Sequence, residues 1–566
     1  MKTIMVLMLS VVIVSSDAQN PLLIPPILEG PVFDLSVQIG STEFFPGITT
    51  TTYGVNGDIL GPTLLFDKGE TVQLNVTNNL SSTTTMHWHG LHVSALNDGG
   101  PHQLIEEGAT WSPQFEVMNH AGTFWYHPHG EGKTDFQVSK GIAGFIIVKD
   151  DAESALELPR TYGVDDFPLV LQTKSFDILN QIQIATHADT TVMVNATVNA
   201  YLDVPAQVVR FRLLNGASDR TFLVGLSNDM EFSQIGTDGG LLQAPNTVNR
   251  IRVANGERFE ILVDFSAMEG QSVYLMSYGS ELPDGIMGAE TVGMGMAELD
   301  GYSENPLNGT DFQLLQLNVV QSTENAVTTV PPMLVSIDEI PLSEVDVERT
   351  LTLSAMEMGP LNMIAGPFGI NGVQFNMEAV NITCHLDDTE LWTINNQTQV
   401  AHPFHIHDVE FLITDVNGNE PDPGQMGWKD VVLVMPMASV SFITRFEHFA
   451  DPVTPYMYHC HLLHHEDEGM MGSFVVTDPN PVAELNPVTI SVAPNPVLPG
   501  DGIFVASNLE DIDELVLRDM TGREVCRQFP LSKEASINPG IIEVAGIYLL
   551  IIKIGENFQT ARIMIY

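Results

Sequence analysis

One short stretch around Cys460 constrains the fold of this chain more than any other. Cys460 stands between His459 and His461, with His465 five residues and Met470 ten residues after it. On an extended strand successive side chains point to opposite faces, so His459 and His461 point one way and Cys460 the other. A thiolate, imidazoles and a weak thioether suit a mononuclear copper site, while the flanking histidines would hold metal on the far face of the strand. A buried Cys is also an ordinary apolar filler, and His-rich tracts bind metal adventitiously, so the interpretation needs support elsewhere.

Three more His-x-His pairs supply that support, at His87–His89, His127–His129 and His405–His407. Each pair places two imidazoles on one side of an extended segment. One pair is weak evidence, because neighbouring histidines are often only solvated, but two pairs fall in one predicted domain. With the pair around Cys460 they make eight imidazoles, which suit three copper ions shared between two domains. Pro403 is expected to turn the chain so that His402 points elsewhere. The donors left for one further copper are His402, Cys460, His465 and Met470.

Short runs rich in Val, Ile, Thr and Phe recur along the chain and are broken by Gly, Asn, Asp and Pro. Long helical periodicity is scarce, so the pattern predicts an all-β fold of Greek-key sandwiches or barrels. The strands predicted most clearly are Thr71–Val76, Thr123–Tyr126, Gly144–Val148, Val208–Leu214, Arg258–Asp264 and Val431–Val434.

The 566 residues suffice for about three or four domains. An early Lys2, the apolar run Ile4–Val14 and a small-residue cleavage site before Gln19 indicate a secretory signal peptide, which is too short to span a membrane. No other run is apolar and long enough to span a bilayer, so no integral membrane segment is predicted. Linkers are predicted at Asp150–Leu158 and Gln321–Glu344. The predicted organisation is a signal peptide at 1–18, three β-domains at 28–150, 160–321 and 345–478, and a C-terminal domain at 488–566.

The middle domain has a single histidine, His187, and no cluster of ligands, so it is interpreted as a structural spacer. The three cysteines are too few for a disulfide framework; with Cys460 as a ligand, Cys384 and Cys526 fall in separate predicted domains. The net charge of −49 excludes nucleic acid and anionic membranes as default partners. Such acidity fits a salt-tolerant soluble surface, with the gathering of Cu²⁺ or Mn²⁺ as an alternative.

Taken together, these motifs resemble those of a three-domain multicopper oxidase built from cupredoxin domains. The chain is most similar to the laccase and cuprous-oxidase branch from bacteria, over roughly residues 30–478. The segment Gly427–Asp430 also looks like part of the family pattern. The motifs that carry the resemblance are His87-Trp88-His89-Gly90, His127-Pro128-His129, His402-Pro403-Phe404-His405-Ile406-His407, and His459-Cys460-His461 through Met470.

The resemblance implies four copper ions per chain and a role for each donor. It assigns His402, Cys460, His465 and Met470 to the type 1 copper, and His87 and His405 to the type 2 copper. It assigns His89, His127, His129, His407, His459 and His461 to the binuclear type 3 pair. Met471 is an alternative axial ligand, but the interval from Cys460 favours Met470. The other seven histidines, including His464, are expected to be ordinary polar residues.

The resemblance also implies the reaction. Donors would give electrons singly at the type 1 copper, and the electrons would pass through Cys460 to the cluster, where O₂ is reduced to water. Asp98 and Glu466 are candidate proton donors by family position, and general acids must lie within hydrogen-bond reach of the group that takes the proton. The alternative for Asp98 is a turn residue beside Gly99 and Gly100.

The reductant is predicted from the residues near the type 1 site. A Met axial ligand suggests a moderate potential that suits Cu(I), phenols and similar donors. Cuprous oxidases of this branch carry a long Met-rich insertion, and an acidic residue and a Met before the first type 1 His. Here Leu353–Met363 offers only three methionines, and Gln397–Ala401 lacks the acidic residue and the Met. A laccase-like enzyme with phenol and amine donors is therefore predicted, with Cu(I) or Mn²⁺ oxidation as the alternative.

Two other classes are disfavoured. A copper nitrite reductase has two such domains and lacks the type 3 histidines, and a non-enzymatic copper-binding relative would have lost ligands. This chain keeps every ligand of the family pattern.

The C-terminal segment Ile490–Tyr566 reads as a small β-sandwich and resembles the sorting domain of the type IX secretion system. This resemblance implies that the signal peptide directs export across the inner membrane and the type IX machinery across the outer one, to the cell surface or the medium. An accessory carbohydrate-binding sandwich is the alternative. A monomer is expected.

Overall fold

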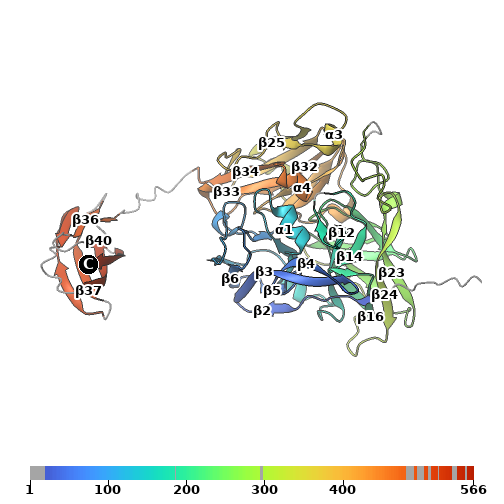
Figure 1. Ribbon diagram of the computed structural model, residues 1–566, viewed down its shortest axis with the longest axis horizontal. Coiled ribbons are helices and arrows are strands. Elements are labelled where there is room, and N and C mark those ends of the chain that lie inside the picture. Colours follow the sequence, from blue (N-terminus) through green and yellow to red (C-terminus); the bar gives the residue numbers. More distant parts are fainter. Residues whose placement is uncertain are drawn as a thin grey trace, which may run out of the picture. The chain divides into compact units, whose positions relative to one another are not determined.

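The computed structural model describes residues 19–184, 186–293 and 297–479, and then 490–493, 503–507, 511–519, 522–537, 545–554 and 557–565. The predicted signal peptide, residues 1–18, lies outside the described residues. The chain divides into two compact units, Met1–Thr477 and Asp478–Tyr566 (Figure 1). Strands dominate both units, which confirms the predicted all-β class with three cupredoxin-like sandwiches and a small C-terminal sandwich.

The first sandwich carries the first two His-x-His pairs on neighbouring strands. One sheet has the order β2 (Ile27–Glu29), β5 (Thr63–Asp67), β11 (Gly144–Lys149), β10 (Gly122–His127) and β7 (His87–His89). The other has the order β4 (Ile48–Val55), β3 (Val32–Phe45), β6 (Thr71–Asn78) and β8 (Thr110–Trp111), with β9 (Gln114–Glu116) also on β6. Every second residue of β6 is buried, because alternate side chains of a strand face the same side.

The middle sandwich lies between the other two in sequence and also takes up the start of the described chain. Its first sheet has the order β1 (Asn20–Pro21), β16 (Ala200–Pro205), β24 (Asp311–Val320), β23 (Ser272–Tyr278), β18 (Phe222–Leu226) and β21 (Ile251–Val253). Its second has the order β15 (Thr197–Val198), β14 (Thr191–Val194), β12 (Asp166–Phe176), β17 (Val208–Asn215), β22 (Arg258–Asp264), β19 (Phe232–Thr237) and β20 (Gly240–Val248), with β13 (Ile182–Gln183) on β12. Strands β17 and β22 are buried over nearly their whole length.

The third sandwich carries the remaining histidine pairs and Cys460. One sheet has the order β26 (Phe368–Ile370), β25 (Val347–Ala355), β28 (Thr389–Asn396), β32 (Ser439–Arg445) and β30 (Phe411–Val416). The other has the order β27 (Ile382–His385), β34 (Met471–Thr477), β33 (Asp451–Cys460), β29 (His402–Ile406) and β31 (Val431–Val434). Each sandwich encloses its own cluster of buried hydrophobic side chains.

Helices are short and connect strands. The α-helices are α1 (Thr134–Lys140), α2 (Asp151–Ser154), α3 (Asn362–Ala365) and α4 (Leu463–Asp467). The 3-10 helices are η1 (Ala95–Asn97), η2 (Gly279–Glu281), η3 (Leu342–Glu344) and η4 (Pro423–Gln425). Helix α2 falls inside the first predicted linker, where Asp150 caps it by accepting from the backbone N–H of Glu153. In the described part of the chain, none of the helices is long and apolar enough to cross a membrane.

The C-terminal unit is a separate small sandwich around its own buried core. One sheet has the order β35 (Ile490–Ala493), β36 (Ile503–Ser507) and β39 (Glu534–Ile537). The other has the order β38 (Glu524–Gln528), β37 (Glu514–Asp519), β40 (Gly546–Ile554) and β41 (Asn557–Ile565). From Tyr548 onward, every second side chain of β40 is buried, as expected when one face of a strand packs on the core, whereas β37 buries three consecutive residues, Leu515, Val516 and Leu517.

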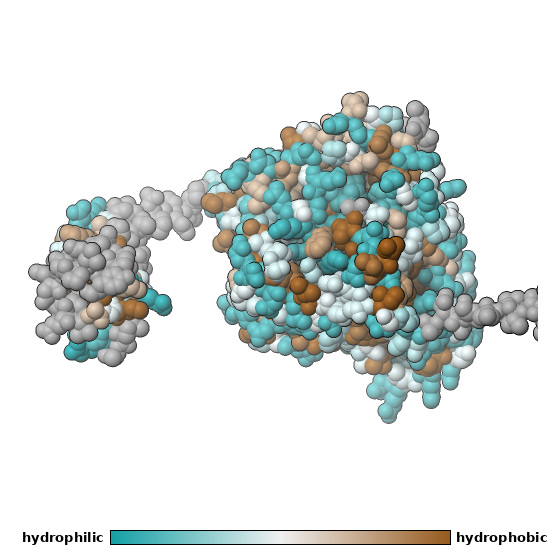
Figure 2. Space-filling view, viewed as in Figure 1, coloured by the Kyte–Doolittle hydropathy of each residue, from teal (hydrophilic) through white to brown (hydrophobic). Residues whose placement is uncertain are grey.

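The six strands predicted most clearly from the sequence are all present as β6, β10, β11, β17, β22 and β31. All three cysteines lie in described segments and are free. Figure 2 shows hydrophilic side chains spread over the visible face of the large unit among scattered hydrophobic ones, in keeping with the strongly acidic composition.

Candidate functional site

The four His-x-His pairs converge on one buried pocket between the first and third sandwiches. Strand pairing brings them together in twos: His127 lies opposite His87 in one sheet, and His405 lies opposite His459 in another. All eight imidazoles are at most 1% exposed. Rings of the two sandwiches stack on each other, with centroids 3.9 Å apart for His87 and His407. Residues more than three hundred positions apart therefore share one interface, as the sequence predicted.

The nitrogen atoms that point inward form groups fit for metal ions. Nε2 of His129 lies 3.1 Å from Nε2 of His459 and 3.2 Å from Nε2 of His407. In the described part of the chain, Nε2 of His87 and Nε2 of His405 are buried without a hydrogen-bond partner. Buried polar atoms without partners are costly, so their convergence points to a ligand that occupies the space between them. The eight imidazoles thus fit a cluster of copper ions, for which imidazole is a suitable ligand.

Most of the outward nitrogen atoms are held in place by a second layer of contacts. Nδ1 of His87 donates to the backbone carbonyl of Asp98 at 3.0 Å, and Nδ1 of His127 to that of Pro128 at 2.8 Å. Nδ1 of His405 donates to the backbone carbonyl of Asp430 at 2.8 Å. Such contacts fix which nitrogen is free to bind a metal and are a regular feature of metal sites.

Burial also keeps these imidazoles neutral. It lowers the pKa of every member for which a shift is resolved, and neighbouring imidazoles lower it further. The pKa of His461 falls to about 3 by burial. The pKa of His407 falls to about 4, because burial and His87 outweigh the opposing effect of Asp98. Neutral imidazoles have a lone pair for a metal, whereas protonated ones do not.

Two buried carboxylates lie against the pocket, and both were singled out from the sequence. Oδ2 of Asp98 accepts from Nδ1 of His407 at 2.9 Å, and its Oδ1 lies 3.3 Å from Nδ1 of His87. Glu466, on α4, places Oε1 3.4 Å from Nδ1 of His129 and Oε2 3.3 Å from Nδ1 of His459. Burial raises the pKa of Glu466 well above its usual range. Burial acts in the same direction on Asp98, but His407 and His87 outweigh it and bring the pKa of Asp98 below its usual range.

A second group of donors lies on the opposite face of β33. Sγ of Cys460 is 3.4 Å from Nδ1 of His402 and 3.6 Å from Nδ1 of His465. Met470 is fully buried in the same hydrophobic cluster, and its backbone carbonyl accepts from the N–H of Cys460 at 3.1 Å. Burial raises the pKa of the Cys460 thiol, so a thiolate here requires a cation at the site. A thiolate with two imidazoles fits a type 1 copper.

The predicted turn at Pro403 is wrong. Pro403 lies inside β29 and pairs with Leu433 of β31 without interrupting the strand. His402 faces away from His405 and His407 because residues separated by an odd number of positions point to opposite faces of a strand. Strand alternation therefore separates His402 and Cys460 from the paired histidines, while His465 comes from α4.

The middle sandwich provides part of the pocket wall, which was not predicted from the sequence. A Cβ on Gly256 would lie 2.8 Å from Cδ2 of His461, and Arg258 binds the carboxylate of Asp430. Two signals were available: Arg258 begins a mostly apolar strand, and Lys429-Asp430 directly precedes the apolar run Val431–Val434. His464 is also more than a surface residue, since its Nδ1 binds a carboxylate oxygen of Asp219 at 2.5 Å.

The chain is similar to known multicopper oxidases along most of its length. Three family models described as multicopper oxidase match residues 36–153, 178–294 and 344–480. Multicopper oxidase mco of Staphylococcus haemolyticus is 31% identical over 480 residues, which cover 82% of this chain and 94% of that protein. Cell division protein FtsP of Xenorhabdus nematophila is 33% identical over 465 residues, which cover 80% and 91%.

Solved structures show the same likeness. A bacterial laccase-like multicopper oxidase, CueO, from the lignin-degrading bacterium Ochrobactrum sp. superposes with a TM-score of 0.71 at 33% identity, covering 81% of this chain and 100% of that one. McoA multicopper oxidase from the hyperthermophile Aquifex aeolicus superposes with a TM-score of 0.71 at 30% identity, covering 81% and 100%.

Proposed function

The chain belongs to the multicopper oxidase family, and we propose on that premise that it is an exported, laccase-like oxidoreductase that couples oxidation of phenols and aromatic amines to reduction of O₂ to water. The observation that carries the proposal is the complete set of buried donors in two groups, which the Cys460 strand joins directly. His459 and His461 face one group and Cys460, between them, faces the other. Relatives that have other roles share the fold, so this donor set, rather than the fold, supports the enzyme.

The proposed ligands follow the family pattern and fit the geometry. The type 1 copper takes His402, Cys460, His465 and Met470. The type 2 copper takes His87 and His405, whose Nε2 atoms are both buried without a hydrogen-bond partner in the described residues. The type 3 pair takes His89, His127 and His461 on one side and His129, His407 and His459 on the other; the second trio has Nε2 atoms within contact of each other. This gives four copper ions per chain. When bound, copper supplies the one-electron oxidation of the donor and the four-electron reduction of O₂.

The residues of the chain orient the ligands, exclude bulk water and handle protons. The pocket walls are buried, and seven of the eight imidazoles are held in one orientation by a contact of the outward nitrogen. Asp98 and Glu466 each contact two histidines of the pocket, and both are proposed to take part in proton delivery. Burial favours the protonated form of Glu466, so Glu466 would hold the proton, whereas Asp98 is held ionised by His407 and His87 and would accept one in the relay. The middle sandwich closes one wall of the pocket.

The environment of the type 1 site favours organic donors. Residues Gln397–Ala401, which precede His402, bring Thr398 rather than a carboxylate or a thioether, and its Oγ1 hydrogen-bonds Nε2 of His402 at 2.8 Å. Met358 is 93% exposed on the loop that leads to α3. A metal-ion donor would need soft or charged ligands at the type 1 site, and Gln397–Ala401 supply neither. Oxidation of Cu(I) or Mn²⁺ is therefore kept as the alternative.

Oxygen uptake decides the substrate class. The copper-reconstituted protein is compared on a phenol such as 2,6-dimethoxyphenol, on Cu(I) and on Mn²⁺ under the same conditions. Faster turnover of the phenol supports a laccase-like enzyme. Faster turnover of Cu(I) or Mn²⁺ would replace that proposal with metal detoxification.

We further propose export through the signal peptide at 1–18 and the C-terminal sorting domain at 488–566, which the type IX secretion machinery would recognise and remove, leaving a monomeric enzyme at the cell surface or in the medium. The separation of a compact Asp478–Tyr566 unit supports a removable domain. Deletion of residues 488–566 in a host with this machinery should leave the protein in the periplasm. An immunoblot that finds the truncated protein in the medium would contradict the proposed sorting role.

A further inference from the structure

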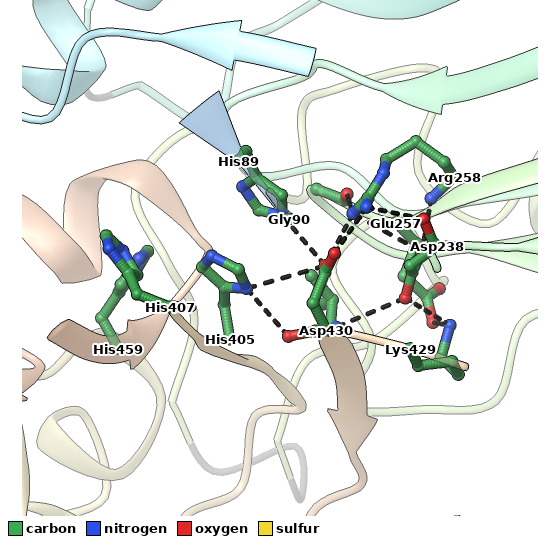
Figure 3. A network of polar contacts seen from close by, with 12 residues as sticks. His89, Gly90, Asp238, Glu257, Arg258, His405, His407, Lys429, Asp430 and His459 are labelled. Carbon is green, nitrogen blue, oxygen red and sulfur yellow. Dashed lines mark hydrogen bonds and ion pairs between the residues drawn. The ribbon is translucent and has the colours of Figure 1, made fainter. Parts of the chain in front are cut away.

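Asp430 contacts the metal pocket from outside, and it does so through two histidines (Figure 3). Its Oδ1 accepts from Nε2 of His89 at 3.1 Å, and its backbone carbonyl accepts from Nδ1 of His405 at 2.8 Å. His89 belongs to β7 of the first sandwich and His405 to β29 of the third. One buried residue therefore contacts a histidine from each of the two sandwiches that supply the pocket.

His89 is oriented opposite to the other histidines whose outward contact is defined. Six of the eight turn Nδ1 outward, namely His87, His127, His129, His405, His407 and His459. His89 instead turns Nε2 outward to Asp430 and Nδ1 inward, 3.4 Å from Nε2 of His127. An ionised carboxylate only accepts hydrogen bonds, so Nε2 of His89 carries the proton and the lone pair lies on Nδ1. Asp430 thus selects the nitrogen of His89 that faces the pocket.

Arg258, from β22 of the middle sandwich, holds the carboxylate of Asp430 in this orientation. Its Nη1 donates to Oδ1 at 2.6 Å and its Nη2 to Oδ2 at 2.5 Å. The guanidinium is itself fixed, because Nε donates to the carbonyl of Thr123 at 3.1 Å and Nη2 to the carbonyl of Asp238 at 2.9 Å. A bidentate arginine fixes both the position and the plane of a carboxylate.

The surrounding charges and packing leave this arrangement little freedom. Nζ of Lys429 lies 2.8 Å from Oδ2 of Asp238 and 3.0 Å from Oε1 of Glu257 (Figure 3). Gly90, next to His89, approaches so closely that a Cβ there would lie 2.4 Å from Oδ2 of Asp430. The middle sandwich is therefore more than a spacer, since its charged residues reach the pocket without supplying a ligand.

We propose that Asp430, held by Arg258, is a positioning residue that sets the ring orientation of His89 and so determines whether the cluster binds its copper. This inference rests on the proposed function, because it takes the paired histidines to be copper ligands. Removal of such an outer partner typically lowers metal affinity about 10- to 100-fold. The type 1 donors form a separate group on the other face of β33, so the type 1 copper keeps its affinity.

Paired substitutions separate positioning from stability. Arg258→Met/Asp430→Leu removes both charges, and exchange of a buried ion pair for apolar residues of similar volume is often tolerated. Arg258→Met/Asp430→Asn differs only in that residue 430 keeps an oxygen able to accept from His89. The matched control is Arg212→Met/Asp166→Leu, which removes a buried bidentate pair of the middle sandwich with Nε–Oδ1 and Nη2–Oδ2 distances of 2.8 Å.

Copper per chain is measured after dialysis against graded chelator, together with the blue band of the type 1 site and the near-ultraviolet band of the type 3 pair. The variant Arg258→Met/Asp430→Leu is expected to lose cluster copper at about 10- to 100-fold lower chelator strength while it keeps the blue band. The variant Arg258→Met/Asp430→Asn is expected to recover most of that affinity. The control Arg212→Met/Asp166→Leu is expected to match the unsubstituted protein.

Three results would overturn the positioning role. They are full cluster copper in Arg258→Met/Asp430→Leu, equal copper losses in the Asp430→Leu and Asp430→Asn double variants, or loss of the blue band together with the cluster copper in Arg258→Met/Asp430→Leu. Failure of the proposed function looks different, because the unsubstituted protein would then bind no cluster copper in the same experiment.

Discussion

Asp98→Asn should slow the reduction of O₂ without slowing the entry of electrons at the type 1 site. Asp98 accepts from Nδ1 of His407 at 2.9 Å and lies 3.3 Å from Nδ1 of His87. Because Nδ1 of His87 also donates to the backbone carbonyl of Asp98, the substitution mainly affects the hydrogen bond from His407, where a neutral amide replaces the charged carboxylate. Loss of a hydrogen bond to a charged group costs about 1.5–3 kcal/mol, or roughly 10- to 150-fold.

The proton-transfer role gives a second estimate of the same loss, since a positioned acid or base contributes about 10²- to 10⁴-fold. The two ranges overlap near a loss of about 100-fold in steady-state O₂ turnover. The assay pairs oxygen uptake with anaerobic stopped-flow bleaching of the blue band by the same phenol. Bleaching should keep its rate within about twofold, because the type 1 donors do not contact Asp98 in the described hydrogen bonds.

The matched control is Asp408→Asn. Asp408 is also buried and follows His407 directly, but its Oδ1 contacts Nδ1 of His92 at 2.9 Å rather than a histidine of the pocket. This variant should keep oxygen uptake close to that of the unsubstituted protein. If Asp98→Asn slows bleaching instead of oxygen uptake, or if both variants slow uptake equally, the proposed role of Asp98 is refuted.

Three further changes have defined outcomes. Cys460→Ser should abolish the blue band and oxygen uptake together, and uptake that persists without the band would refute the type 1 assignment. Gly256→Ala, at φ +80° and with a Cβ 2.8 Å from Cδ2 of His461, should add about 1–2 kcal/mol of backbone strain and lower the copper content of the cluster; an unchanged content would contradict that packing. Burial lowers the pKa of His92, but the Asp408 carboxylate outweighs burial and raises the pKa to about 9. The His92–Asp408 pair should therefore stabilise the fold fully below pH 6.5, and this stabilisation should be lost as pH rises through 9. Chemical unfolding of His92→Gln and the unsubstituted protein should therefore differ at pH 6 and converge above pH 9, and a constant difference would contradict it.

The fold and the two donor groups were predictable because both depend on local periodicity. Alternation of two residues places His459 and His461 on one face and Cys460 on the other, whatever lies beyond the strand. The same rule already separates His402 from His405, so a turn at Pro403 was unnecessary and the strand continues through it. Strand alternation therefore accounts for the faces of these residues, whereas the predicted turn at Pro403 was wrong.

The pocket wall was not predictable in the same way, because it depends on contacts between distant segments. Arg258 and Asp430 are separated by 172 positions and belong to different sandwiches. The sequence shows each as a charge beside an apolar run, but a buried charge must have a partner, and nothing local identifies which residue it is. A search for charged residues beside apolar runs could have identified Arg258 and Asp430 as buried and in need of partners. It could also have indicated that the middle sandwich contributes to the pocket wall.

If both donor groups bind copper and act together to reduce O₂ to water, the stoichiometry of the reaction must show it. The measurement is the number of donor molecules oxidised per O₂ consumed, with hydrogen peroxide determined in the same samples. We expect four one-electron oxidations per O₂, no accumulation of peroxide and about four copper ions per chain. Two oxidations per O₂ with an equivalent of peroxide, or no uptake by protein that holds its copper, would contradict it.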